Sequence, residues 1–526
     1  MFTFFGDISN NSSVMNHTFK LTSEENPIDS NKSATRLGDR IRAFSNTFQP
    51  IDWRIVFLAL FTGGLFAVIQ FGGRGLLDID AYYHTKMAFL MQKNLVPAFT
   101  WLPLTILSPE KYVDHHWLFH ILLIPFTYGN LILGGKIAAV VFPTLAFLAA
   151  GLVMKTMKVP AAELWTIALF AASSGLLYRL SMTRGQSLSL LWMMIEIILL
   201  FKKKDIWLFF LGVTYVWLYN AFPLFLVLAS VYFILNGLLE GEWRWKMAIL
   251  AAAGIAAGLV INPFFPRNLA FIYEHYVAKL DIQAISVGRE WYPYTTTQLL
   301  ENAGGAIIAF LAGIAAIGLN RERINLQTAF LLVLTIVFGY MVFQSRRFIE
   351  YFPVFPILFF AFAWQPIIPR MPFQKWAAIG AAALVIGVAI LNARSTRADL
   401  ASYDPPELLE GGANWLSKNT KPGSMVFQTD WDDFPRLFFY DSNNTYLIGL
   451  DPTYLSLADQ ALYDKWVELT QGRSENGLAS DIQKTFNTCY AITDLEHKNF
   501  IEAAKKDPAM KQVFKDNNSA VYQFCQ

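Results

Sequence analysis

The stretch WRIVFLALFTGGLFAVIQFGGRGLLDIDAYYH, residues 53–84, is the most informative in the chain. Its first part, residues 53–72, is an apolar run long enough to cross a bilayer as a helix. The run is followed by Asp78 and Asp80, and then by two tyrosines and His84. Because carboxylates at a membrane boundary are costly, their presence there indicates a function. The stretch therefore predicts chemistry at a membrane surface.

Composition places the whole chain in the membrane class. Hydrophobic residues make up 54% of the 526 residues and charged residues only 16%, whereas a soluble protein carries about 25% charged residues. The formal net charge of +2 gives no sign of a nucleic-acid partner. We therefore expect membrane lipids, and no nucleic acid, among the partners.

Apolar runs of roughly 17–25 residues predict transmembrane helices. About eleven such runs follow one another, and several are shorter than a full span. They cover residues 53–72, 132–154, 161–178, 187–201, 206–220, 222–239, 247–264, 304–319, 327–343, 350–364 and 376–393. The stretch 206–239 is either two helices or one helix kinked around Asn220 and Pro223. The fold class is thus a mostly α-helical polytopic membrane protein.

The loops predict the sidedness of these spans, because short cytoplasmic loops collect lysine and arginine. If the N-terminus is cytoplasmic, every second loop is basic. The basic loops hold Lys155, Lys158, Lys202, Lys203, Lys204, Arg244, Lys246, Arg321, Arg323, Arg370 and Lys375. The opposite loops, chiefly 73–131 and 265–303, then face outward together with everything after residue 394. Asp78 and Asp80 accordingly lie on the outer face of a cell membrane.

Three parts of the chain are expected. Residues 1–50 are polar and predict a disordered cytoplasmic tail. Residues 51–394 form the transmembrane domain, and residues 395–526 predict a soluble extracytoplasmic α/β domain. Cys489 and Cys525 either form one disulfide bond or are two small core residues.

The C-terminal domain has a recognisable pattern of elements. A helix is expected near 406–418, and strands are expected at 424–428, 489–493 and 520–525. An Asp- and Asn-rich turn region, 430–445, follows the first of these strands. Its start, Thr429-Asp-Trp-Asp-Asp-Phe-Pro-Arg436, is either a recognition loop or a calcium-type turn.

The carboxylate pair has two readings. In an extended segment the side chains of residues i and i+2 share one face, so Asp78 and Asp80 would approach one cation, and oxygen ligands suit Mg²⁺ or Mn²⁺. Alternatively, Asp80 caps a surface helix from Ala81 to Lys93 by accepting from its free N–H groups.

Three further clusters carry candidate functional groups. His116 and His120 have the i, i+4 spacing of a zinc site, or else bond locally or contact a phosphate. Glu290, beside Arg289, is either functional or part of a surface ion pair. The paired Arg346 and Arg347 match phosphate oxygens, the alternative being an internal pair with Glu350.

Four motifs, in the right order and on one side of the membrane, resemble those of the catalytic subunit of oligosaccharyltransferase, a GT-C fold membrane glycosyltransferase. Asp80-Ala-Tyr-Tyr-His84 is similar to that family's first-loop Asp-Pro-Tyr-Tyr-His. Ile285-Ser-Val-Gly-Arg-Glu290 stands where the family has Ser-Val-Ser-Glu, and Arg347-Phe-Ile-Glu-Tyr351 is similar to an archaeal Arg-Phe-x-Tyr-Tyr. Ala413-Asn-Trp-Leu-Ser-Lys-Asn-Thr420, followed by Trp431-Asp432, resembles the lead-in to Trp-Trp-Asp-Tyr-Gly.

The resemblance implies a set of roles. The catalytic residues would be Asp80, Asp78 and Glu290. The ligands of the donor phosphate would be Arg347, Arg346, Arg184 and His84. The acceptor would meet Trp431 and Asp432. A metal ion, Mg²⁺ or Mn²⁺, would bind Asp80 and Glu290.

The chain departs from the family at two places. The turn Tyr178-Arg-Leu-Ser-Met-Thr-Arg184-Gly-Gln186-Ser lacks the acidic pair that the family carries there, which removes a metal ligand. The reaction is therefore either weakly dependent on a metal or independent of one, with arginines offsetting the phosphate charge. In place of Trp-Trp-Asp-Tyr-Gly the chain has Asp430-Trp-Asp-Asp-Phe434, which leaves the acceptor open.

The resemblance implies transfer of a sugar or oligosaccharide from a polyprenyl-phosphate or polyprenyl-pyrophosphate donor on the outer face. The acceptor is a protein, a cell-surface glycan or a lipid, and a polysaccharide ligase would share the same donor. A transporter or flippase is disfavoured, because transporters place ionisable groups near the bilayer midplane and often show repeats. Here the charges cluster in the outward loops.

Overall fold

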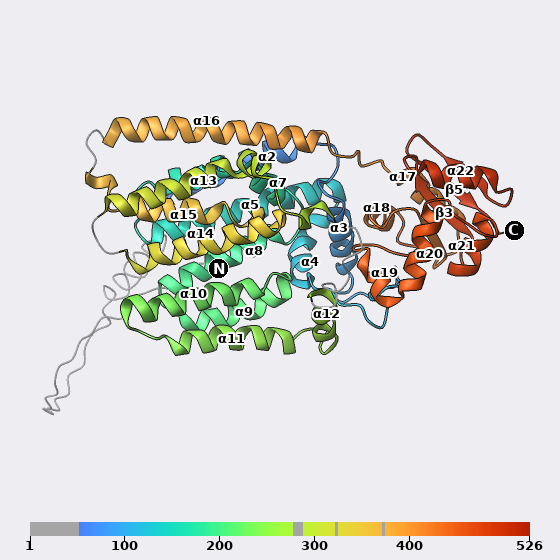
Figure 1. Cartoon of the computed structure of the whole chain (residues 1–526), viewed down its shortest axis with the longest axis horizontal. Coiled ribbons are helices and arrows are strands. Elements are labelled where there is room, and N and C mark those ends of the chain that lie inside the picture. Colours follow the sequence, from blue (N-terminus) through green and yellow to red (C-terminus); the bar gives the residue numbers. More distant parts are fainter. Residues whose placement is uncertain (1–51, 277–287, 321–323, 371–373, 526) are drawn as a thin grey trace, which may run out of the picture. The chain divides into compact units, whose positions relative to one another are not determined.

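The computed structural model describes residues 52–276, 288–320, 324–370 and 374–525. The expected tail, 1–50, lies outside the described residues, and so do residues 285–287 of the motif that ends at Glu290. Each of the eleven expected apolar segments contains a helix (Figure 1). The chain is therefore a multi-pass membrane protein with mostly helical structure.

Six helices in the described part of the chain are long and apolar enough to cross a membrane. They are α2 (Trp53–Gln70), α5 (Leu131–Thr156), α10 (Pro223–Glu240), α13 (Thr296–Leu319), α14 (Leu326–Gln344) and α16 (Gln374–Ala401). Shorter apolar helices accompany them, namely α6 (Ala162–Ala172), α8 (Gln186–Phe201), α9 (Asp205–Leu218), α11 (Trp245–Val260) and α15 (Val354–Trp364).

Two of the expected segments are interrupted. The segment 161–178 is divided at Ser173, whose extended backbone separates α6 from α7 (Ser174–Leu180) and whose hydroxyl caps Leu176 N–H at 2.9 Å. The stretch 206–239 is two helices rather than one kinked helix. Tyr219 is extended after α9, and Pro223 begins α10, where its fixed φ and missing N–H cost nothing.

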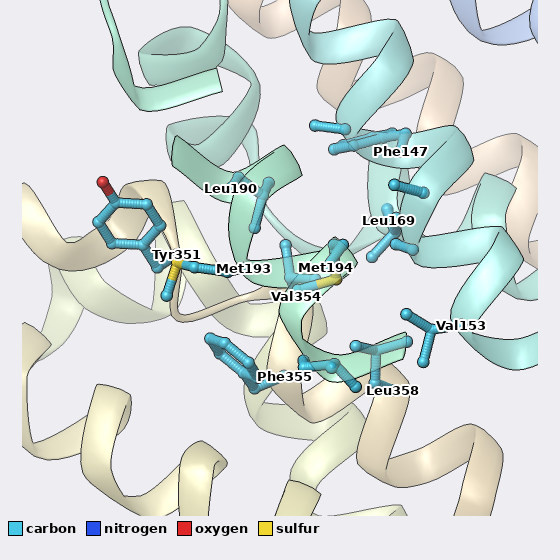
Figure 2. Close-up of a cluster of buried hydrophobic side chains, with 14 of the residues drawn as sticks. Phe147, Val153, Leu169, Leu190, Met193, Met194, Tyr351, Val354, Phe355 and Leu358 are labelled. Atoms are coloured by element: carbon cyan, nitrogen blue, oxygen red, sulfur yellow. The ribbon is translucent and has the colours of Figure 1, made fainter. Parts of the chain in front are cut away.

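The core of the helical region lies where α5, α6, α8 and α15 meet. Figure 2 shows side chains from these four helices and the adjoining Tyr351 converging on one apolar centre. Phe147, Leu169, Met193, Met194 and Leu358 are all fully buried there. Burial of this kind contributes about 1.5–3 kcal/mol per large apolar side chain when the reference is water. The wide buried face of α5 and α8 thus explains why these helices are the central ones.

Helices α9 and α11 approach each other through small residues. A Cβ atom added to Gly254 would lie 2.4 Å from the carbonyl oxygen of Phe209, and one added to Gly258 would lie 2.9 Å from that of Val213. The spacing Gly254-x-x-x-Gly258 is the small-residue pattern of closely packed membrane helices. The two helices lie side by side in Figure 1.

The expected surface helix of the first loop is α3 (Asp80–Met91). The same loop also forms α4 (Trp117–Leu123), which is continued by η1 (Ile124–Thr127). The loop 265–303 contributes α12 (Arg267–Tyr276), η3 (Arg289–Trp291) and the start of α13. A short 3₁₀ helix, η4 (Arg346–Glu350), connects α14 to the segment before α15.

The C-terminal part is a five-stranded mixed sheet with helices. Its strands are β1 (Met425–Gln428), β2 (Thr445–Tyr446), β3 (Tyr490–Asp494), β4 (Lys511–Lys515) and β5 (Ser519–Gln523), in the order β2-β1-β3-β5-β4. The first three are mutually parallel, and β5 is antiparallel to both β3 and β4. The helices are α17 (Glu410–Asn419), α18 (Phe434–Tyr440), α19 (Thr453–Ala458), α20 (Gln460–Thr470), α21 (Leu478–Phe486) and α22 (Lys498–Lys506).

Two expectations for this part are resolved. Cys489 and Cys525 form a disulfide bond, with Cα atoms 5.1 Å apart. The region 430–445 was expected to be turns, but it contains α18. The aromatic run from Phe434 to Tyr440 forms this helix because its apolar side chains pack against the first loop.

The first loop and the C-terminal part share one core. The ring of Tyr83 on α3 lies 5.8 Å from the ring of Phe438 on α18, and Lys86 Nζ donates to the carbonyl oxygen of Phe439 at 3.0 Å. Trp101 Nε1 donates to the carbonyl oxygen of Ser442 at 2.8 Å. These contacts fix the C-terminal loops against the residues that follow α2.

Candidate functional site

A cavity of about 870 Å³ lies between loops of the helical region and the C-terminal part. Its lining comes from the turn before α3, the turn between α7 and α8, η3, η4 and the loops that follow strands β2, β1 and β3. All these segments belong to the loops that the sequence assigns to one side of the membrane. Residues distant in sequence are thus brought to one site.

The turn between α2 and α3 carries the two predicted carboxylates. Asp78 has a left-handed backbone, with φ of 74°, which is uncommon for a residue with a side chain. Asp80 is the first residue of α3 rather than its cap: the N-cap position is Ile79, and no side chain caps this end. The capping reading of Asp80 is therefore wrong, because its carboxylate is directed to an arginine instead.

That arginine is Arg184, in the turn between α7 and α8. Its Nε lies 3.1 Å from Asp78 Oδ2, one of its terminal nitrogens bonds to Asp80 Oδ2, and the other lies 3.8 Å from Glu290 Oε2. The two aspartates therefore converge on one positive group, which is a guanidinium of the chain itself.

Glu290 lies among three arginines. Arg179 contacts its carboxylate at 2.5 Å, Arg347 at 3.5 Å and Arg184 at 3.8 Å. Burial by itself would raise the pKa of Glu290, but these three positive charges outweigh it and hold the pKa well below its usual range. Arg179 also contacts the buried Glu350 at 2.8 Å. We call Arg179, Arg184 and Arg347 the arginine wall.

The two arginines of the pair Arg346-Arg347 point to different surroundings. Arg347 lines the cavity, stacks over the ring of Trp291 at 4.9 Å and donates to Tyr219 Oη at 3.0 Å. Arg346 donates instead to the carbonyl oxygens of Tyr292 and Pro293, at 3.1 and 3.0 Å. The alternative considered for this pair, an ion pair with Glu350, is made by Arg179 instead.

A chain of buried hydrogen bonds ends at the cavity. His84 on α3 lines the cavity, and its Nδ1 lies 2.8 Å from Nε2 of His120. Nδ1 of His120 lies 2.7 Å from Oδ2 of Asp114. Burial, followed by the neighbouring His120 and His115, holds the pKa of His84 well below its usual value, so its ring is neutral at pH 7.

These bonds fix the orientation of the His84 ring at the edge of the cavity. His120 bonds to Asp114 through Nδ1 and to His84 through Nε2, so it connects the two residues. Of the i, i+4 pair, His116 also lines the cavity, whereas His120 bonds to Asp114 and His84.

The opposite side of the cavity is acidic. Asp430, Asp432 and Asp433 follow β1, and Asp494 ends β3. Strands β1 and β3 are parallel neighbours, with Gln428 in register with Ile492, so the carboxyl ends of both strands open at one edge of the sheet. All four aspartates line the cavity, and we call them the aspartate wall.

Their proximity perturbs their ionisation. Burial, followed by the charge of Asp430 and a hydrogen bond with it, raises the pKa of Asp432 to about 7. Burial, followed by Asp432, Asp430 and Asp494, raises the pKa of Asp433 well above its usual value. The pKa of His497 is raised by its 2.8 Å bond to Asp494. Asp432 and Asp433 are therefore harder to ionise than isolated aspartates.

The residues present do not form a metal site of the predicted kind. Asp80 and Glu290 both face Arg184, whose guanidinium occupies the position between the carboxylates that a cation would take. Within the described residues no group of three or more His, Cys, Asp or Glu side chains is placed to hold a metal ion. The positive charge of Arg184 thus already faces Asp80 and Glu290, the two predicted metal ligands.

The structure brings most of the sequence-predicted residues to one cavity. Those that line it are Asp78, Asp80, His84, Arg184, Glu290, Arg347, Trp431 and Asp432, whereas Arg346 bonds to backbone carbonyls. Sequence reasoning missed Arg179, Asp433 and Asp494 as site residues. Arg179 stands in the turn already singled out at residues 178–187, and Asp494 directly follows an expected strand, so both had a positional signal.

No protein-family model matches the chain, and no curated protein sequence matches it. Solved structures do. The oligosaccharyltransferase of Archaeoglobus fulgidus, in its apo form, superposes with a TM-score of 0.60 at 12% sequence identity, covering 90% of this chain and 75% of that one. The chain has a GT-C fold.

Two other proteins with this fold are similar over most of the present chain. ArnT from Cupriavidus metallidurans, bound to undecaprenyl phosphate, has a TM-score of 0.53 and 14% identity, covering 90% of this chain and 97% of that one. The mycobacterial arabinofuranosyltransferase AftD has a TM-score of 0.57 and 14% identity, covering 91% of this chain and 40% of that one. The GT-C fold predicted from the motifs is therefore confirmed. Because the sequence identities are only 12–14%, these similarities establish the fold and nothing further.

Proposed function

We propose that the chain is a membrane glycosyltransferase that transfers a sugar or oligosaccharide from a polyprenyl-phosphate or polyprenyl-pyrophosphate donor. The observation that carries the proposal is the arginine wall, which gathers three guanidiniums around Glu290 and Asp80 in a cavity next to membrane helices. Guanidinium forks match phosphate oxygens in geometry and charge. The solved structures offer support, since the A. fulgidus enzyme is known with dolichol-phosphate and ArnT with undecaprenyl phosphate.

The chemistry follows from where charge develops. As the bond between the sugar and the phosphate breaks, negative charge grows on the leaving phosphate, and preorganised positive groups stabilise it. Arg347 and Arg184 would supply those groups. The acceptor nucleophile would lose its proton to Asp80, which lines the cavity. Asp78 would support Asp80 through their shared contact with Arg184.

We further propose that no metal ion is required. Arg184 contacts Asp78 and Asp80 and lies near Glu290, so it neutralises the carboxylates that would otherwise bind Mg²⁺ or Mn²⁺. The same guanidinium faces the cavity, where it can offset phosphate charge. Arg184 would thus offset the negative charge of the phosphate, as a divalent cation would.

Three features support an outward-facing site with about eleven spans. The loops that line the cavity are the opposites of the lysine- and arginine-rich loops, and basic loops are cytoplasmic. The disulfide between Cys489 and Cys525 suits an oxidising compartment outside the cytosol. The short apolar helices would complete the spans together with the six long ones. The polar tail 1–50 would then be cytoplasmic, and residues 395–526 an extracytoplasmic domain.

The acceptor is a protein or a glycan in this proposal. Trp431 and Asp432 stand on the C-terminal side of the cavity, where the resemblance places the acceptor. A structure of the A. fulgidus enzyme carries a tethered acceptor peptide, which supports a protein acceptor. A transferase that adds a sugar to a cell-surface glycan or lipid remains the second candidate, since ArnT and AftD share the fold.

The proposal is tested in cells with and without the chain by mass spectrometry of lipid-linked sugars, glycoproteins and surface glycans. Loss of the chain should raise the pool of one lipid-linked sugar and remove that sugar from one acceptor class. Wild-type chain should restore both, and the Asp80→Asn variant should restore neither. Unchanged lipid-linked sugars and unchanged glycoconjugates would overturn the proposal.

A further inference from the structure

Histidines gather on one part of the cavity lining. The sequence has only seven histidines, and four of them line the cavity next to one another, namely His84, His115, His116 and His275. They come from α3, from the loop before α4 and from the end of α12. We call these four residues the histidine cluster. The mechanism proposed above uses none of them, so it does not explain why they meet.

The rings of the cluster form a continuous surface. The ring centroids of His84 and His116 lie 5.0 Å apart, and those of His116 and His115 lie 4.1 Å apart. The next pair, His115 and His275, is separated by 5.6 Å. Nδ1 of His275 lies 3.1 Å from Oη of Tyr454 on α19. The surface therefore extends from the first loop to the C-terminal part.

The cluster adjoins both the proposed base and a proposed phosphate ligand. Asp80 and His84 are four residues apart on α3, so their side chains share one face of that helix. The ring of His116 lies 5.2 Å from the ring of Tyr219, whose Oη accepts from Arg347 at 3.0 Å. The sugar of a lipid-linked donor must lie between these same two groups, because its anomeric carbon is bonded to the phosphate and is attacked by the acceptor.

The chemistry of the rings suits hydroxyl groups. Burial, followed by the neighbouring His120 and His115, holds the pKa of His84 well below its usual value. Burial, followed by His115 and His84, does the same to the pKa of His116. A neutral imidazole offers one N–H donor and one acceptor nitrogen, and a sugar hydroxyl both donates and accepts. A ligand rich in hydroxyls therefore complements these rings.

A charged sugar fits this surface less well. Neither Asp114 nor Glu274, the acids adjacent in sequence to the cluster, is among the described residues that line the cavity. Asp451 does line it, but its Oδ1 accepts from the N–H of Thr453 at 2.9 Å. An ammonium group would also be repelled by Arg347. An acidic sugar would need protonated rings, and burial opposes their protonation.

We propose that the histidine cluster is the subsite for the donor's sugar, and that this sugar has no charged substituent. The inference rests on the proposed function and names the class of sugar that is transferred. His84 would then bind the sugar, whereas the family resemblance implies that it binds the phosphate. The phosphate would be left to the arginine wall.

The test is a binding measurement by native mass spectrometry on the full chain in nanodiscs, without acceptor. The probes are undecaprenyl phosphate and dolichyl phosphate, each bare or carrying glucose, mannose, galactose or arabinose. At least one of these neutral sugars should raise the affinity over that of the bare lipid phosphate by about tenfold, through its hydrogen bonds. The same lipids carrying glucosamine or glucuronic acid should bind no more tightly than the bare lipid phosphate.

Variants locate the subsite. His116→Phe and His275→Phe keep a ring and remove its nitrogens, so each should weaken binding of the preferred sugar-lipid by about tenfold and leave the bare lipid phosphate unaffected. Arg347→Ala should weaken both. His497→Gln is the matched control, because His497 lines the same cavity but bonds to Asp494, and it should change neither affinity. Thermal unfolding of each variant shows that it is folded.

The outcomes separate this inference from the proposed function. Sugars that add no affinity, or cluster variants that weaken the bare lipid phosphate as much as the sugar-lipid, would overturn the inference. Tighter binding of the glucosamine or glucuronic acid lipid would overturn it too, because the preferred sugar would then be charged. A loss of sugar-lipid affinity in the His497 variant as large as in the cluster variants would contradict the location. A chain that binds no lipid phosphate, with or without a sugar, would overturn the proposed function itself.

Discussion

Arg184 and Asp80 are 104 positions apart in the chain and form an ion pair inside the cavity. The pair joins the turn after the first membrane helix to the turn between α7 and α8. Arg184 reaches Asp78 with the same guanidinium, so a single side chain contacts two of the three predicted catalytic carboxylates. The predictions below follow from this arrangement and from the two walls.

Replacing Asp80 by asparagine should lower the transfer rate by at least about a hundredfold, because proton transfer by a positioned group contributes about that much. The protein should still fold, since the amide can accept from Arg184. Asp78→Asn should cost less, because only Asp80 matches the family motif. The assay is transfer from a synthetic lipid-linked sugar. Full activity of the folded Asp80→Asn variant would remove Asp80 from the mechanism.

Replacing Arg347 by alanine should raise the KM for the lipid donor by about tenfold or more and change kcat less. Arg347 faces the cavity and stacks on Trp291, so its loss removes a phosphate ligand. Arg346→Ala is the comparison, since Arg346 bonds to backbone carbonyls and should affect stability more than donor affinity. The kinetics are followed at varied donor concentration. An unchanged KM in the Arg347 variant would contradict the assignment.

Exhaustive chelation should leave most of the activity in place, and added Mn²⁺ or Mg²⁺ should not raise it much. The reason is that Arg184 already lies between Asp80 and Glu290. The measurement is the transfer rate after treatment with a chelator, with each metal added back separately. Complete loss followed by full rescue would show that a cation displaces Arg184 when substrate binds.

Stability should depend on pH through the aspartate wall. The pKa of Asp432 is raised to about 7 in the folded protein by burial, Asp430 and Asp494, against the opposing charge of Arg436. Between about pH 4 and pH 7 the folded state therefore binds more protons than the unfolded state. The free energy of unfolding should fall as the pH rises through this window.

The Asp432→Asn variant isolates this effect. Above pH 7 its melting temperature should exceed that of the wild type by roughly 1–3 °C, and the difference should vanish near pH 4. Melting curves of both proteins at several pH values provide the measurement. A variant that is less stable than the wild type above pH 7 would show that the Asp432 charge is favourable in the folded state.

The sequence predicts the helices well and the contacts between them poorly. Apolar length is a local property, so the segments 132–154 and 327–343 correspond closely to α5 and α14. The resemblance also places Asp80, Glu290 and Arg347 on one side of the membrane. The pairing of Arg184 with Asp80 joins residues 104 positions apart, so it depends on the tertiary fold, which no local pattern encodes.

The aspartate wall shows the same limit. Asp430 and Asp494 stand next to expected strands, but their meeting requires that β1 and β3 be parallel neighbours. Strand order is a property of the whole domain. The sequence likewise predicts that the aromatic run 434–440 is part of a turn region. It forms α18 because that helix packs against α3, a contact that the local sequence does not reveal.

The shared core of α3 and α18 has a consequence for how this protein can be altered. The residues beside Asp80 and the helix that follows Asp433 are joined by Tyr83 with Phe438 and by Lys86 with the carbonyl of Phe439. These contacts hold α3 and α18 together, so they contribute to the spacing between the two halves of the cavity. A chimaera that takes its C-terminal part from another protein would need residues on α3 that pack against the new α18. The two halves of the cavity can therefore be exchanged only together.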